Sequence, residues 1–354
     1  MKVLTARLDS MGDVLLAGPA VRAVAAAATE VRLLCGPQGA AAGKLLPGVD
    51  GVLTWSAPWI SDPAPDFTPG SARELLEMVT EFRPDAAVLF TSFHQSPLPL
   101  AALLRLGGVP RITGASIDYA GSLLTTRLTP GEDFPEDQPE VLRALDIAEA
   151  AGFPRPADTR LAVQLPEPSE PSRFTLTGPY VVVHPGAAAP ARQWPPGHHR
   201  ALVAELTRRG HTVVVTGTPA ETDLTARVAA NGGIDLGGRT TLVEMARLLG
   251  GAQVLVTGNT GPAHLGAAMG AKIVSLFSPV VPAARWAPWG VPTILLGDQH
   301  APCRNTRARN CPVPGHPCLT GLAPARVADA CEQLIFDPER ASTFASAQME
   351  GAAQ

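Results

Sequence analysis

One stretch, residues 252–278 (AQVLVTGNTGPAHLGAAMGAKIVSLFS), constrains the fold of this chain more than any other. Its apolar run at 254–256 is typical of a buried parallel strand, and a tight turn of glycines and small polar residues follows. Pro262 stands where a helix would begin, and Gly270 where it would end. A second apolar strand is predicted at 273–277. The loop of this strand–loop–helix–strand unit presents backbone N–H groups at a helix N-terminus, which suits a phosphate. An ordinary β–α turn is the alternative.

A second loop of this kind lies near the N-terminus. A strand at 3–7 leads into a short polar segment and then an apolar helix. The segment contains Asp9, Ser10, Gly12 and Asp13. Two polar, glycine-bearing β–α loops, one early and one late, suggest two domains that face each other.

Short apolar strands and helices alternate along the whole chain, which predicts right-handed βαβ crossovers and parallel sheets. The N-terminal strand extends over 2–7, and further strands are predicted at 31–35, 51–55, 86–91, 110–113, 180–183, 213–215 and 234–236. Helices are predicted at 13–28, 37–46, 71–82, 97–106, 138–151, 197–209, 241–249 and 324–336, with another that ends near 230. The fold class is therefore α/β, with doubly wound sheets.

A proline-rich segment divides this pattern in two. We predict an N-terminal Rossmann-like domain at 1–165, a linker at 166–178, a second Rossmann-like domain at 179–336 and a loose polar tail at 337–354. Open parallel sheets bind ligands at the carboxyl ends of their strands. The expected site is therefore the cleft between the two domains.

Composition excludes several classes of protein. The net charge is −4 and no basic stripe is evident, so nucleic-acid binding is not indicated. No apolar run reaches the roughly 18–20 residues of a membrane span. The chain enters a strand pattern at once, without the layout of a signal peptide. We expect a cytoplasmic protein, and peripheral contact with the inner face of a membrane stays open.

Several residues at strand ends have both a structural and a functional interpretation. Asp13 is either a first-turn carboxylate favoured by the helix dipole or a general base, and Asp9 could be the helix cap. Arg192 is either a solvated surface residue or a phosphate ligand. Glu221 is either a helix N-terminal acid or an acceptor for ribose hydroxyls. Trp194 is expected to anchor the loop that carries Arg192.

Histidines give weaker signals. His184 and His264 each lie at a strand–helix junction, and His94 follows the fourth strand on the side expected to meet an acceptor. A lone histidine in such a place is more often structural than catalytic.

Some familiar catalytic motifs are absent from the sequence. It has no G-x-S-x-G elbow, no Walker A run, no G-x-G-x-x-G in the first loop and no D-x-D pair to hold a metal-bound diphosphate. Phosphate binding would then depend on helix N-termini and Arg192, and neither a metal nor a cofactor is expected.

A cysteine-rich segment, APCRNTRARNCPVPGHPCL, remains ambiguous. Cys303, Cys311 and Cys318 lie near His300 and His316, but no C-x2-C pair is present. A metal site, a disulfide and a structural loop all stay open.

Together these segments resemble glycosyltransferase family 9, the lipopolysaccharide-core heptosyltransferases. The opening R-x-D-S-x-G-D at 7–13 is similar to the start of that family. The loop HPGAAAPARQWP resembles its K-x-W-P segment, and NTGPAH at 259–264 resembles its D-[ST]-G-P-x-H motif. CPVPGHPCL has a counterpart in some members. The resemblance covers about 1–330, with the four motifs in the family's order.

The resemblance implies a GT-B fold and inverting, metal-independent sugar transfer from a nucleotide diphosphate sugar, ADP-linked in the family. The donor would bind the C-terminal domain and a glycan, lipid-linked or small-molecule acceptor the N-terminal one. Asp13 matches the proposed base, with Asp9, Ser10, Gly12 and His94 on the acceptor side. The donor-binding residues would be Arg192, Glu221, Asn259, Thr260, Gly261 and His264.

Asn259 replaces the family's Asp, which contacts the sugar. An amide both donates and accepts, whereas a carboxylate only accepts, so a different pattern of sugar hydroxyls is expected. Two other hypotheses remain: an epimerase or hydrolase of sugar nucleotides on the same scaffold, and a sugar-nucleotide-binding protein without turnover.

Overall fold

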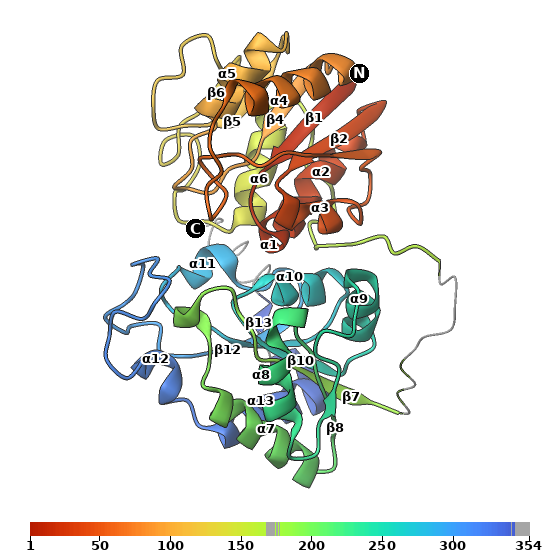
Figure 1. Cartoon of the computed structure of the whole chain (residues 1–354), viewed down its shortest axis with the longest axis vertical. Coiled ribbons are helices and arrows are strands. Elements are labelled where there is room, and N and C mark those ends of the chain that lie inside the picture. Colours follow the sequence, from red (N-terminus) through yellow and green to blue (C-terminus); the bar gives the residue numbers. More distant parts are fainter. Residues whose placement is uncertain (168–173, 175, 177, 341, 344–354) are drawn as a thin grey trace. The chain divides into compact units, whose positions relative to one another are not determined.

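The structure is a computed structural model that describes residues 1–167, 174, 176, 178–340 and 342–343. The chain divides into two compact units, Met1–Gln164 and Leu165–Gln354 (Figure 1). Most of the predicted linker at 166–178, and residues 344–354 of the predicted tail, lie outside the described residues.

The first unit has one parallel sheet in the order β3-β2-β1-β4-β5-β6. Its strands are β1 (Lys2–Arg7), β2 (Glu30–Cys35), β3 (Gly51–Thr54), β4 (Ala86–Leu89), β5 (Ile112–Ala115) and β6 (Thr126–Leu128). Its helices are α1 (Met11–Leu16), α2 (Gly18–Ala25), α3 (Pro37–Gly43), α4 (Pro69–Phe82), α5 (Leu98–Leu106) and α6 (Glu140–Ala150). This strand order is that of a dinucleotide-binding Rossmann fold, and β1, at its centre, has five buried residues out of six.

The helices of the first unit form two layers. α1, α2, α3 and α6 contact one another, while α4 packs against α5 (Figure 1). The sheet is therefore covered on both faces, which explains why its central strands are continuous apolar runs. Side chains of β1, β4 and the layer of α4 and α5 make one of its cores, including Leu4, Leu75 and Leu104.

The second unit repeats this order. Its sheet runs β13-β12-β11-β10-β7-β8-β9. The strands are β7 (Tyr180–His184), β8 (Thr212–Val215), β9 (Ile234–Asp235), β10 (Val254–Gly258), β11 (Ile273–Leu276), β12 (Pro292–Leu296) and β13 (Ser342–Thr343). Six of them are parallel, and β13 pairs antiparallel with β12 at the edge. The predicted doubly wound α/β class is confirmed for both units.

Along the chain, the helices of the second unit alternate with these strands. They are α7 (Pro196–Arg208), α8 (Thr222–Ala229), α9 (Leu242–Gly250), α10 (Gly261–Ala268), α11 (Ala283–Trp286), α12 (Pro317–Thr320) and α13 (Pro324–Phe336), with short 3-10 turns η1 (Pro190–Arg192), η2 (Pro219–Glu221) and η3 (Pro338–Arg340). α7 contacts both α8 and α13, and α9 contacts α10. The valines of β7, β8 and β10 and the apolar faces of α7 and α13 share one core.

Some predicted elements differ from the structure. The helix expected at 13–28 is two helices, α1 and α2, that meet at Ala17. Pro19 has no N–H to continue the ladder of hydrogen bonds there, so the chain restarts with proline in the first turn of α2. The strand predicted at 110–113 lies at 112–115, and β6, β12 and β13 were not predicted.

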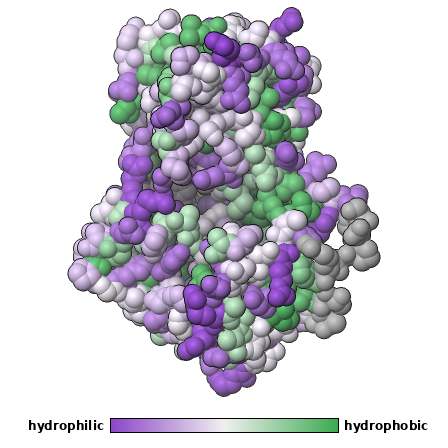
Figure 2. Space-filling view, in the orientation of Figure 1, coloured by the Kyte–Doolittle hydropathy of each residue, from purple (hydrophilic) through white to green (hydrophobic). Residues whose placement is uncertain are grey.

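No helix in the described part of the chain is long and apolar enough to cross a lipid bilayer. Figure 2 shows hydrophilic and hydrophobic residues interspersed over the visible face of each unit.

Candidate functional site

In the first unit the charged residues gather at the carboxyl end of β1. Arg7, the last residue of β1, is 2% exposed, and its guanidinium lies among three carboxylates. Nε is 2.7 Å from Asp9, Nη2 is 3.1 Å from Asp13, and Nη1 and Nη2 are each 3.3 Å from Glu140 Oε2. Nη2 also donates to the Ser92 hydroxyl at 2.6 Å. One buried cation thus joins β1, α1, α6 and the loop after β4.

Asp13 is the most accessible carboxylate of this group. Its side chain is 20% exposed, against 9% for Asp9 and 0% for Glu140. It lies in the first turn of α1 as predicted, and its second oxygen accepts from the Ser10 hydroxyl at 2.7 Å. The N-cap of α1 is Ser10, so the interpretation of Asp9 as the cap is wrong. Asp9 is instead held between Arg7 and the Gln95 amide.

Burial determines how the inner carboxylates titrate. It raises the pKa of Asp9 to about 6; Arg7 opposes this, while Asp13 adds to it. Burial also raises the pKa of Glu140, against the pull of Arg7 and Arg143. No local sequence pattern indicates Glu140 or Ser92 as a partner of Arg7, because 133 and 85 residues separate them from it.

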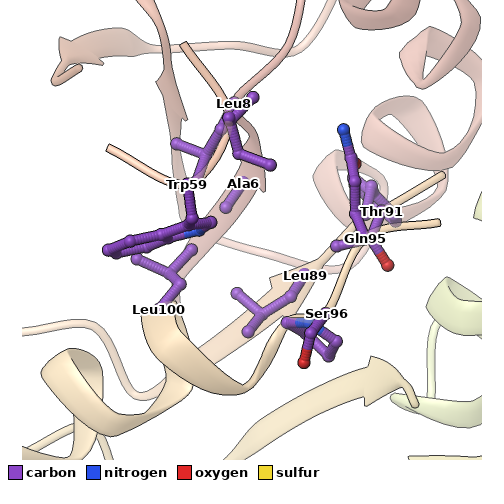
Figure 3. A pocket seen from close by; sticks show the side chains of 11 residues that line it. Ala6, Leu8, Trp59, Leu89, Thr91, Gln95, Ser96 and Leu100 are labelled. Carbon is purple, nitrogen blue, oxygen red and sulfur yellow. The ribbon is translucent and has the colours of Figure 1, made fainter. Parts of the chain in front are cut away.

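A narrow apolar pocket lies beside this group in the first unit. Figure 3 shows Trp59 and Leu100 on one side of it and Thr91 and Gln95 on the other. Gln95 is therefore shared between the pocket wall and Asp9. His94 is exposed and its ring lies against that of Phe93, with centroids 3.3 Å apart. His94 does not line this pocket.

In the second unit the loop between β10 and α10 contains a buried amide. Asn259 is 5% exposed, and neither its Oδ1 nor its Nδ2 has a hydrogen-bond partner in the described part of the chain. Thr260 is the N-cap of α10, with an extended backbone and no capping bond from its side chain. Gly261 and Pro262 form the first turn, and His264 is buried behind them. A buried amide without partners costs about 1–3 kcal/mol, so this loop favours a ligand that both donates and accepts.

The loop that carries Arg192 lies against this same strand end. A Cβ on Gly258 would be only 3.0 Å from the carbonyl oxygen of Arg192, so the glycine allows the two backbones to approach. Trp194 is 1% exposed and donates its indole N–H to the Leu322 carbonyl at 3.2 Å. This confirms the prediction that Trp194 anchors the loop. Arg192 ends the turn η1 and is half-buried.

Glu221 and His184 lie at the neighbouring strand ends. The Glu221 carboxylate accepts from the Thr218 N–H at 2.8 Å and from its hydroxyl at 2.9 Å, which closes a capping box. A Cβ on Gly186 would come within 1.9 Å of Glu221 Oε1, so only glycine leaves room for the carboxylate. His184 contacts Thr216 at 3.1 Å, and its burial lowers its pKa to about 4. It is therefore neutral at physiological pH.

The cysteines are all free thiols, and Cys303 and Cys318 are buried. Burial raises the pKa of Cys318 to about 11, so this thiol is not primed for reaction. Among the described residues, no group of three or more His, Cys, Asp or Glu could hold a metal ion. The segment also contacts the loop that carries Arg192. The Ala191 N–H donates to the Arg309 carbonyl at 2.9 Å, and Nε2 of His316 lies 3.1 Å from the Ala191 carbonyl oxygen.

Comparison with solved structures defines the class of fold. The structure of ADP-heptose LPS heptosyltransferase II from Escherichia coli superimposes with a TM-score of 0.73 and 20% identity, over 96% of this chain and 100% of that one. A glycosyltransferase family 9 structure from Veillonella parvula gives a TM-score of 0.74 and 17% identity, over 95% and 97% of the two chains. The chain therefore has the GT-B fold of two Rossmann-like domains.

Sequence comparison defines the family. The model of glycosyltransferase family 9 (heptosyltransferase) matches residues 95–316, and the chain belongs to this family. It is 31% identical over 178 residues to lipopolysaccharide heptosyltransferase 1 of Pseudomonas aeruginosa, covering 46% of this chain and 49% of the relative. It is 28% identical over 239 residues to lipopolysaccharide heptosyltransferase 2 of Escherichia coli, covering 60% and 65%. The chain thus spans about half to two thirds of the length of these relatives.

Proposed function

We propose that the protein is an inverting, metal-independent glycosyltransferase. It moves a heptose or related sugar from a nucleotide diphosphate sugar, ADP-linked, to a glycan, lipid-linked or small-molecule acceptor. Family membership supports the general reaction, and the similarity to lipopolysaccharide and ADP-heptose heptosyltransferases suggests an ADP-heptose donor and a role in lipopolysaccharide core biosynthesis.

The observation that carries the donor assignment is the amide of Asn259. It is buried at the carboxyl end of β10 with both polar atoms unpaired among the described residues. Such an amide is compensated when a sugar hydroxyl donates to Oδ1 and a hydroxyl or phosphate oxygen accepts from Nδ2. Gly261, next to it in the first turn of α10, would offer its backbone N–H to the diphosphate, which the helix N-terminus favours.

The remaining donor-binding residues would stabilise the leaving nucleoside diphosphate or hold its nucleoside. Thr260, Gly261 and Arg192 would stabilise the diphosphate as its bond to the anomeric carbon breaks. His264 lies in the same helix turn, and Glu221 would accept from the ribose hydroxyls. Because Arg192 is tied to the strand end through Gly258 and Trp194, its backbone is already placed before donor binds.

Asp13 would be the general base. It would take the proton of the acceptor hydroxyl while that oxygen attacks the anomeric carbon, and the diphosphate would leave with the electron pair of the broken bond. Asp13 is exposed enough to meet an acceptor, and Arg7 and Ser10 hold both of its oxygens. The acceptor would therefore bind the first unit, and peripheral contact with a membrane would follow if that acceptor is lipid-linked.

The test is release of nucleoside diphosphate with and without acceptor, for the wild type and Asp13→Ala. Transfer predicts release that depends on acceptor, that survives a metal chelator and that Asp13→Ala abolishes, with donor affinity changed by a few-fold at most. Acceptor-independent release would indicate a hydrolase instead. Donor binding without any release would indicate a binding protein.

A further inference from the structure

The guanidinium of Arg7 pairs directly with Asp13, and Asp13 shares it with Asp9 and Glu140. The guanidinium turns its Nε edge to Asp9, its Nη2 to Asp13 and both terminal nitrogens to Glu140. Because the Arg7 side chain is 2% exposed, solvent screens its interactions with the three carboxylates only weakly. How much of the positive charge reaches Asp13 therefore depends on the ionisation of the other two acids.

Three acids contact the single guanidinium of Arg7. Arg7 faces Asp9 from the end of its own strand, Asp13 from α1 and Glu140 from α6, and Arg143 acts on Glu140 from the same helix. Gln95 and Ser92 are the neutral partners from the loop after β4. Three carboxylates in one place do not all stay ionised as the pH falls, and the buried ones take up the first proton as a coupled unit.

Asp9 is well placed to take this proton. Its side chain is 9% exposed and burial raises its pKa to about 6, whereas Asp13 keeps contact with solvent. Protonation of Asp9 removes the negative charge 2.7 Å from Arg7 Nε, and the guanidinium then acts more strongly on Asp13. A carboxylate under a stronger positive field is a weaker base.

We propose that Asp9 is a positioning residue for Asp13: when ionised it shares the charge of Arg7, and when protonated it leaves Arg7 to Asp13 and weakens the base. This rests on the proposed role of Asp13 in sugar transfer. The consequence is that transfer slows on acidification as Asp9 takes up its proton.

The decisive experiment needs no substrate. The full chain is labelled with ¹³C at the aspartate carboxyls and titrated by NMR, with Asp9→Asn and Asp13→Asn assigning the two resonances. We expect the Asp9 resonance to titrate near pH 6. The Asp13 resonance should show an inflection at the same midpoint, and Asp9→Asn should abolish that inflection. A flat Asp13 resonance between pH 5 and 7, or an inflection that persists in Asp9→Asn, would overturn the proposal.

Kinetics give the second reading, with ADP release from ADP-heptose. Asp9→Asn mimics the protonated state, so kcat at pH 8 should fall roughly three- to ten-fold with KM for the donor unchanged, and the acidic limb near pH 6 should disappear. Asp158→Asn is the matched control, because it removes a carboxylate from an exposed Arg–Asp pair in the same unit. If the wild type transfers no sugar, the proposed function fails, while the titration still decides the coupling of Asp9 to Asp13.

Discussion

Replacing Gly186 by alanine tests whether the loop after β7 is shaped around Glu221. The new Cβ would be 1.9 Å from Oε1 and 2.4 Å from Cδ of Glu221, far inside van der Waals contact. The backbone of Gly186 is not in the left-handed region, so alanine adds no backbone strain there. The Glu221 side chain is the flexible partner and must leave, and its two hydrogen bonds to Thr218 are lost with it.

The expected cost is that of the capping box. Losing such a cap costs about 1 kcal/mol, which lowers the midpoint of thermal unfolding by roughly 2–4 °C in a unit of this size. Glu221→Ala should cost a similar amount alone. In the Glu221→Ala background, Gly186→Ala should be neutral or slightly stabilising, because the clash is gone and alanine restricts the unfolded chain.

Calorimetric or chemical unfolding of the four proteins of this double-mutant cycle is the assay. Strong coupling between the two substitutions supports the account, since both remove the same interaction. If Gly186→Ala destabilises as much in the Glu221→Ala background as in the wild type, Glu221 is not what requires the glycine. The reasoning from the Cβ contact is then refuted.

Three further outcomes are expected. Trp194→Phe should lower the free energy of unfolding by about 1–2 kcal/mol in chemical denaturation, because the buried Leu322 carbonyl loses its donor; no change would mean that water replaces it. Burial keeps His184 neutral in the folded protein down to about pH 4, whereas in the unfolded chain it takes up a proton below about pH 6.5. The free energy of unfolding should therefore fall by up to about 3 kcal/mol between these two pH values. In His184→Asn the free energy of unfolding should depend less on pH between 7.5 and 4, and an unchanged dependence would contradict this. Asn259→Ala should weaken binding of the ADP-sugar more than binding of ADP in calorimetric titrations, because the sugar loses its amide partner, and equal weakening of both would remove Asn259 from the sugar site.

The elements that could be predicted from the sequence are those with a clear apolar run and a glycine or proline at their ends. Apolar runs such as 254–256 and the proline at 262 marked β10 and α10 because buried parallel strands and helix starts carry those signals. The strands at or next to the sheet edges were harder. β12, next to the edge strand β13, begins at a proline and only two of its five residues are buried, so its pattern is weak.

The candidate site could be predicted only where its residues are close in sequence. Asp13 and the 259–264 segment carry recognisable local patterns. The anchoring role of Trp194 could be predicted because a tryptophan in such a loop is rarely left exposed. Glu140, by contrast, is the first residue of an ordinary amphipathic helix. Only folding of the sheet brings its carboxylate to Arg7, so no local pattern could indicate it.

Donor binding is the most direct test of the central claim. Thermal unfolding of the full chain is measured with ADP, ADP-heptose and other nucleoside diphosphates and their sugars, for the wild type and Arg192→Ala. A ligand at 100 times its dissociation constant adds about 2.7 kcal/mol, so ADP-heptose should raise the unfolding midpoint measurably, and less so in Arg192→Ala. A larger shift with another nucleotide would overturn the ADP assignment alone. If no nucleoside diphosphate or nucleotide sugar shifts the midpoint, the proposed donor site in the second unit is contradicted.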